Sequence, residues 1–180
     1  MTLPAGLAPN AYMPKHLKPE LDLTLPIGTG SPKKQAKLVQ ERLCLAGFNL
    51  KVDGDFGPAT TQQMKAFQQK AGLQGSGSYG NKEHDLLAAP FVKAINPLAA
   101  GGQKLGATIV AVARQHTKQH PVEVGGDNRG PWVRMYMDGN EGEEWKWCAG
   151  FCFFIIEQAC DILGQSMPMS KSSFGIGTPI

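Results

Sequence analysis

The sequence lacks the features that mark several protein classes. No apolar run is long enough to span a bilayer, since the longest is the short stretch Phe151 to Ile156. Residues 1–23, MTLPAGLAPNAYMPKHLKPELDL, lack the basic region and continuous apolar core of an export signal. Neither sign of charge dominates, because 18 Lys and Arg stand against 15 Asp and Glu. We therefore predict no membrane insertion, and a net charge of +3 does not indicate a nucleic-acid partner.

Cysteine is also scarce, with Cys44, Cys148, Cys152 and Cys160 as the four thiols. They form no C-x-x-C pair, and their spacing matches no common zinc pattern. The missing export signal argues against a disulfide framework. We predict that Cys44, Cys152 and Cys160 are reduced thiols that pack as small apolar side chains. No cofactor and no metal site is predicted.

The 180 residues have room for one ordinary domain or two small ones, and 42% hydrophobic content is typical of a globular protein. Residues 1–30 carry five prolines without periodicity, which predicts an extended arm. We place a helical bundle at 31–90, a linker at 91–102 and a second domain at 103–180. No internal repeat is evident.

Apolar residues recur at helical spacing in five segments, which predicts a mainly α fold. The first two helices precede Gly47 and Gly72, and a third spans about 81–89. They form a small three-helix bundle. Two later helices are expected at about 103–120, before Pro121, and at about 147–163. The loop between them, 122–145, is rich in glycine and charge.

The segment VQERLCLAGFNLKVDGDFGPATTQQMKAFQQKAGL, with its central turn VDGDFGPAT, resembles the peptidoglycan-binding domain that accompanies many wall hydrolases. Much of the turn has a structural reason, since Gly54 suits positive φ and Pro58 suits the first helical turn. The resemblance implies that the surface beside this turn receives the wall polymer. It makes Asp53, Gly54, Asp55 and Phe56 the candidate binding residues, and peptidoglycan the expected partner.

The stretches EVGGDNRGPWVRMY and WKWCAGFCFF resemble the N-terminal half of a CHAP-type cysteine peptidase or amidase domain. Such domains have a papain-like α+β fold and cleave peptide or amide bonds in peptidoglycan. The resemblance implies that Cys148 is the nucleophile and that Asn128 and Trp132 contact substrate. We expect this part to be incomplete, because no alternating strand pattern follows Leu163.

The position of Cys148 suits a nucleophile. The start of a helix offers backbone N–H groups without partners and the positive end of the dipole, which together stabilise a thiolate and a tetrahedral oxyanion. The apolar side chains Phe151, Phe154 and Ile155 of the same helix need cover. Without strands, that cover must come from the first module, the N-terminal arm or another molecule.

A cysteine nucleophile also needs a general base, but no histidine follows His120. Whether the chain is an enzyme is therefore left open. The leading hypothesis is a modular wall hydrolase, and the alternative is a non-catalytic peptidoglycan-binding protein. A weaker third possibility is a zinc peptidase using His116 and His120, although His116 falls on an apolar face. Without an export signal, action at the wall would need phage-type or specialised release.

Overall fold

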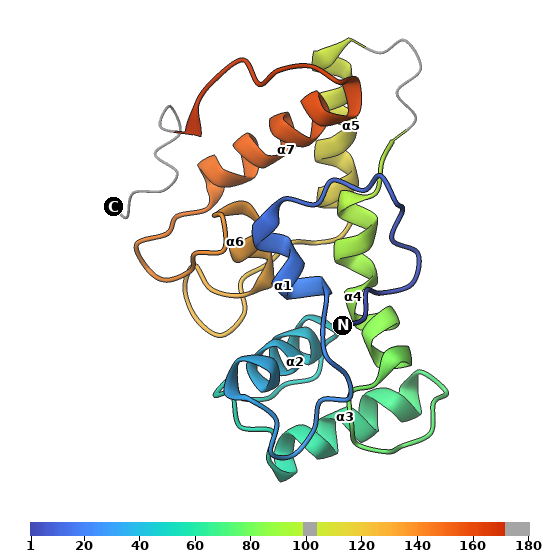
Figure 1. The fold of residues 1–180 in the computed structure, drawn as a ribbon. Helices are drawn as coiled ribbons and strands as arrows, with labels where there is room; N and C mark the ends of the chain where they lie inside the picture. The colour runs from blue at the N-terminus through green and yellow to red at the C-terminus, as the bar shows by residue number, and fades with distance from the viewer. Residues whose placement is uncertain (99–103, 172–180) are drawn as a thin grey trace. The chain divides into compact units, whose positions relative to one another are not determined.

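The computed structural model describes residues 1–98 and 104–171 of the chain (Figure 1). Over these ranges the protein is helical and has no strand, which confirms the mainly α fold class. The elements are η1 (Lys15–Leu17), α1 (Lys18–Leu21), α2 (Lys33–Leu45), α3 (Pro58–Lys70), α4 (Asn81–Ile95), α5 (Leu105–Thr117), α6 (Pro131–Tyr136) and α7 (Cys148–Leu163). None of the described helices is long and apolar enough to cross a membrane.

The chain divides into two compact units. The first unit holds Met1–Gly6 and Pro19–Ala89, and the second holds Leu7–Lys18 and the chain from Pro90 onward. The N-terminal segment is thus shared between the units, and α4 begins in the first and ends in the second.

The core of the first unit contains apolar side chains from α2, α3, the start of α4 and the N-terminal segment. The innermost residues include Ile27, Val39, Leu43, Met64 and Tyr79, each 0% exposed. Pro58 occupies the first turn of α3, and Gly54 has φ +77°, as the sequence predicted. The expected helical bundle is therefore present.

The first unit contains a repeat that we did not find in the sequence. Asp53-Gly54-Asp55-Phe56-Gly57 precedes α3, and Ser76-Gly77-Ser78-Tyr79-Gly80 precedes α4. The second residue of each turn is a glycine with positive φ, +77° at Gly54 and +79° at Gly77. The fourth residue of each is a buried aromatic ring. The repeat escaped the sequence search because Ser replaces Asp twice and Tyr replaces Phe.

The prediction of an extended arm over residues 1–30 is wrong. This segment forms η1 and α1, and isolated bridges join Thr2 to Leu23 and Ile27 to Tyr79. Leu17, Leu21, Leu23 and Ile27 are all at most 5% exposed. The prolines prevented regular helix periodicity, but the leucines between them supply apolar surface that the fold buries.

The helix α4 is longer than expected, because it continues through Pro90 to Ile95 into the segment that we interpreted as a linker. A proline inside a helix removes one backbone donor. Here the residues beyond it, Phe91, Val92, Ala94 and Ile95, are at most 4% exposed. Their burial favours helix over linker, and residues 99–102 of the expected linker lie outside the described ranges.

The second unit is built on the contact between α5 and α7, which lie side by side in Figure 1. Val112, Ile155 and Ala159 form the centre of this contact. The expected helices at about 103–120 and 147–163 correspond to α5 and α7. The loop expected at 122–145 contains the short helix α6, which begins at Pro131 after Gly130 with φ +105°. Five of its six residues are buried.

Candidate functional site

The turn before α3 is held by the side-chain amide of Gln40, which projects from α2. Its Oε1 accepts hydrogen bonds from the backbone N–H of Asp53 at 3.1 Å and of Gly54 at 2.7 Å. Its Nε2 lies 2.9 Å from Asp53 Oδ1 and 2.9 Å from the Asp55 carbonyl oxygen. Gln40 is only 1% exposed, so this residue fixes the turn from beneath.

Two carboxylates stand on the outer side of this turn. Asp53 and Asp55 are exposed, and the backbone N–H of Asp55 donates to Asp53 Oδ1 at 2.9 Å. That hydrogen bond, with the one from Gln40, lowers the pKa of Asp53 below its usual value. Asp53 therefore carries its negative charge to lower pH than a free aspartate.

The other two predicted binding residues of the turn lie inside the protein. Phe56 is 2% exposed and belongs to the apolar core. A Cβ on Gly54 would lie 2.9 Å from the Lys33 carbonyl oxygen, so the backbone packs tightly there. The side chain of Phe56 cannot touch a polymer from this position, and Gly54 offers no side chain. Both shape the turn, while Asp53 and Asp55 present polar atoms on its surface.

Gln68, which projects from α3, holds the turn before α4 in the same way. Its Oε1 accepts from the Gly77 backbone N–H at 2.8 Å, and its Nε2 lies 2.8 Å from Ser76 Oγ and 3.0 Å from the Ser78 carbonyl oxygen. The same Nε2 lies 2.8 Å from Glu83 Oε1, and Gln68 is 0% exposed. The sequence pattern of the family includes Gln68, but we assigned neither glutamine a role in holding a turn. A glutamine on the helix ahead of each Asp/Ser-Gly-Asp/Ser turn would have been the signal.

Cys148 is the first residue of α7 and is exposed. The residue before it is Trp147. The ring of Trp147 stacks on that of Tyr136 with centroids 5.6 Å apart, and its indole N–H donates to Glu123 at 2.8 Å. Two residues further, a Cβ on Gly150 would collide with the Tyr136 carbonyl and with Met137 Sδ. The start of α7 is therefore fixed against the end of α6, with the thiol toward solvent.

The other cysteines differ from one another. Cys160 is 2% exposed, and burial raises the pKa of its thiol, as expected of a packing residue. Cys44 is half-buried and donates to the Leu50 carbonyl oxygen at 3.4 Å. Cys152 is exposed, so the prediction that it packs in the core is wrong. One helical turn after Cys148, the helix face still points toward solvent.

His116 is enclosed in the second unit. Its Nδ1 lies 3.0 Å from the Tyr136 hydroxyl and its Nε2 lies 2.9 Å from Gln158 Oε1, while Gln158 Nε2 donates to the Ala94 carbonyl at 3.0 Å. Burial lowers the pKa of His116 to about 4. Since both ring nitrogens are engaged, His116 is a neutral buried group and offers no nitrogen to zinc. Among the described residues, no group of three or more His, Cys, Asp and Glu is placed to hold a metal ion.

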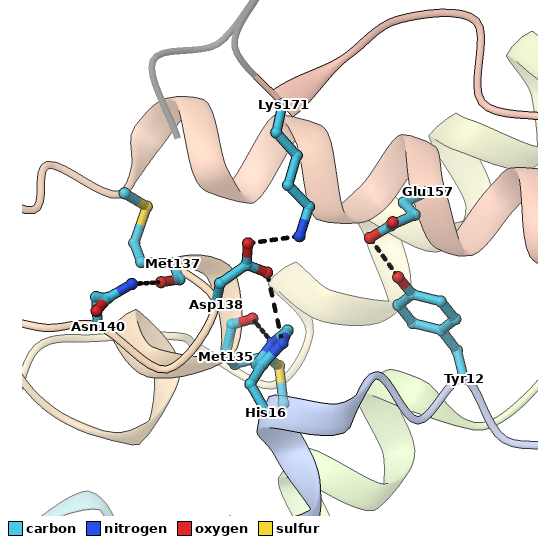
Figure 2. A network of polar contacts seen from close by, with 8 residues as sticks. All are labelled: Tyr12, His16, Met135, Met137, Asp138, Asn140, Glu157 and Lys171. Atoms are coloured by element: carbon cyan, nitrogen blue, oxygen red, sulfur yellow. Dashed lines mark hydrogen bonds and ion pairs between the residues drawn. The ribbon is translucent and has the colours of Figure 1, made fainter. Parts of the chain in front are cut away.

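A second polar network joins the N-terminal segment to the later helices of the same unit (Figure 2). His16 Nε2 donates to the Met135 carbonyl at 2.8 Å, and its Nδ1 lies 3.4 Å from Asp138, which also pairs with Lys171. Tyr12 donates its hydroxyl proton to Glu157, and its ring packs edge-on against Phe154. The N-terminal segment thus covers part of α7, one of the three sources of cover expected from the sequence.

The described contacts of Asn128 and Trp132 are with residues other than Cys148. Asn128 has φ +49°, and its side-chain amide holds the loop together by donating to the Glu143 carbonyl at 3.0 Å. Trp132 is 1% exposed and lies between Phe91, at 4.4 Å, and Tyr136, at 6.2 Å between ring centroids. These contacts give Trp132 a packing role.

Comparison with known proteins identifies the class of the first unit. Residues 33–87 match the family model described as "Putative peptidoglycan binding domain". The match contains both repeated turns and both buried glutamines, and it confirms the peptidoglycan-binding domain predicted from the sequence.

One curated relative extends this comparison. The chain is 39% identical over 75 residues to the N-acetylmuramoyl-L-alanine amidase CwlL of Bacillus licheniformis, over 40% of this chain. That region covers 21% of the amidase, so most of the relative has no counterpart in the match. No solved structure matches the chain.

Proposed function

We propose that the protein binds peptidoglycan through its first unit and belongs to a system that cuts the bacterial wall. The observation that carries the proposal is the family match over residues 33–87. The amidase relative adds support, because its matched part is a fraction of a wall hydrolase.

The turn before α3 gives this binding a chemical basis. Peptidoglycan presents sugar hydroxyl and peptide N–H groups, which are donors that carboxylates accept strongly. Asp53 and Asp55 are exposed acceptors on a turn that Gln40 holds in one conformation. A rigid turn loses little conformational entropy when a polymer binds, so its interactions contribute more of their free energy to affinity.

The binding test compares charge-removing variants in the full-length chain. Asp53→Asn and Asp55→Asn should each reduce the fraction retained on purified peptidoglycan several-fold, with unchanged circular dichroism. Asp127→Asn is the matched control, because Asp127 is exposed and lies in the second unit. If neither turn variant changes retention, the binding surface lies elsewhere on the first unit.

We further propose that Cys148 attacks an amide or peptide bond of the bound wall. The thiolate would add to the carbonyl carbon, N–H groups at the start of α7 would stabilise the oxyanion, and the amine would leave before water releases the acyl group. Exposure of Cys148 and its fixed position beside α6 support this role.

We expect protonation of the leaving amine to limit the rate of this reaction. His16, His84 and His116 each have both ring nitrogens within 3.4 Å of a partner, so none of these three is available as the acid. The fourth histidine, His120, is exposed beyond the end of α5, and no hydrogen bond among the described residues orients its ring. General acid–base help is typically worth about 10²–10⁴-fold in rate. We therefore expect slow cleavage by the chain as it stands.

A dye-release assay on labelled peptidoglycan tests the nucleophile. Slow release by the wild type should disappear in Cys148→Ala and persist in Cys152→Ala, the matched exposed cysteine on the same helix. Release that is absent from all three proteins, or equal in all three, would favour the alternative function, a peptidoglycan-binding protein without catalysis.

A further inference from the structure

Two of the four thiols stand exposed on neighbouring turns of one helix. Cys148 and Cys152 are both exposed, whereas Cys160 is buried and Cys44 is half-buried in the other unit. Free cysteine is among the most frequently buried residue types, so an exposed pair is unusual. Residues four apart on a helix lie on the same face, with Cβ atoms about 5–6 Å apart.

We propose that Cys148 and Cys152 form a redox-sensitive pair, in which Cys152 resolves an oxidised Cys148 as an intrahelical disulfide. The co-reactant is a peroxide. The proposal goes beyond wall binding and cleavage, and it holds whether or not Cys148 cuts a wall bond.

The chemistry proceeds in two balanced steps. The Cys148 thiolate attacks one peroxide oxygen, the O–O bond breaks, and hydroxide leaves and takes up a proton as water. The resulting sulfenic acid is then attacked by the Cys152 sulfur, which forms the S–S bond and releases a second water. Overall, two thiols and one peroxide give one disulfide and two waters, and each sulfur loses one electron.

Closing this bond distorts the first turn of α7, between the fixed positions of Trp147 and Gly150. A disulfide needs Cβ atoms about 3.5–4.5 Å apart, which is closer than an undistorted helix places them. Cys148 is the first helical residue, and Trp147 before it provides no side-chain cap. Moving Cys148 breaks the helical hydrogen bond from the Cys152 N–H to the Cys148 carbonyl and strains the one from the Phe151 N–H to the Trp147 carbonyl at 2.8 Å, while the later turns of α7 stay intact. Cys160, buried two turns further along, cannot replace Cys152.

Mass spectrometry of the reduced full-length protein after graded hydrogen peroxide tests the pair. Chymotryptic cleavage after Phe151 separates Cys148 from Cys152, so a disulfide between them appears as a linked peptide pair. We expect this linkage in the folded wild type, reversal by dithiothreitol, and the same result in Cys160→Ser. In Cys152→Ser, Cys148 should instead advance to irreversible sulfinic acid, with at least a several-fold higher yield.

Two results would overturn the proposal. One is equal sulfinic acid at Cys148 in wild type and Cys152→Ser, which would show that Cys152 does not intercept the sulfenic acid. The other is a linkage that forms in urea but not in the folded chain. Neither depends on wall cleavage, so failure here and failure of the proposed enzymatic function are distinguishable.

Discussion

At the scale of single residues, two buried glutamines hold the two repeated turns of the first unit. Gln40 and Gln68 each use a carbonyl oxygen and an amide nitrogen to hold a glycine-containing turn. A glutamine side chain offers both donor and acceptor, so it can satisfy several backbone groups of a turn at once. At the turn before α3, the carboxylates of Asp53 and Asp55 then take positions that the amide of Gln40 sets.

Replacing Gln40 by Ala should destabilise the first unit. The change leaves the N–H groups of Asp53 and Gly54 without their partner, and unsatisfied groups are costly where they are buried, as at Gly54. The Asp55 carbonyl oxygen keeps the hydrogen bond from the Thr60 hydroxyl. We expect a loss of roughly 2–3 kcal/mol in the free energy of unfolding, measured by urea denaturation. Gln62→Ala, at an exposed position of α3, is the control. Equal effects of the two substitutions would contradict the role of Gln40.

The residues that could be predicted from sequence were those with a local signal. Gly54 and Pro58 were identified because their backbone preferences act within one turn. Phe56 and Trp132 were interpreted as binding residues, but large rings close to a turn contribute more by burial. The role of Gln40 was missed, because its partners lie on a turn more than ten positions away along the chain.

At the scale of elements, the part Leu7–Lys18 of the N-terminal segment belongs to the second unit. Tyr12 and His16 both pack against Phe154 on α7, with ring centroids 5.1 Å and 6.4 Å away. Burial and the hydrogen bond to Glu157 raise the pKa of Tyr12, so the hydroxyl stays neutral and donates. The sequence predicted that other residues must cover the apolar side chains of α7, and it left three possible sources open. It did not single out the N-terminal segment, because the prolines of this segment hide any periodicity.

Two substitutions at Tyr12 separate packing from hydrogen bonding. Tyr12→Phe removes the donor to Glu157 and should cost about 1 kcal/mol. Tyr12→Ala also uncovers Phe154 and should cost roughly 3 kcal/mol. Thermal unfolding followed by near-ultraviolet circular dichroism measures both, with Val110→Ala at an exposed site of α5 as control. A Tyr12→Ala protein as stable as the control would show that the segment does not support α7.

At the scale of the whole molecule, each unit buries a histidine. Burial lowers the pKa of His84 and of His116 to about 4, with Arg42 adding to the effect at His84. An unfolded histidine has a pKa of about 6.5, so the unfolded chain binds more protons between these values. Stability is therefore fully present above pH 6.5 and is lost as pH falls toward 4.

The pH dependence can be measured directly. Each histidine should contribute a loss of roughly 3 kcal/mol in the free energy of unfolding between pH 7 and pH 4, followed by urea denaturation at intervals of pH. Imidazole nitrogen shifts of the folded protein should report both rings as neutral at pH 5.5. Charged rings at that pH in a protein that is still folded would contradict the burial of these two side chains.

Retention on intact wall material tests the central claim, that the first unit binds peptidoglycan. The full chain is mixed with purified peptidoglycan sacculi, centrifuged, and quantified in pellet and supernatant over a range of sacculus concentrations, with insoluble cellulose as the comparison. We predict saturable retention on sacculi, little on cellulose, and competition by soluble peptidoglycan fragments. A folded protein that stays in the supernatant with sacculi, or pellets equally with cellulose, would contradict the claim.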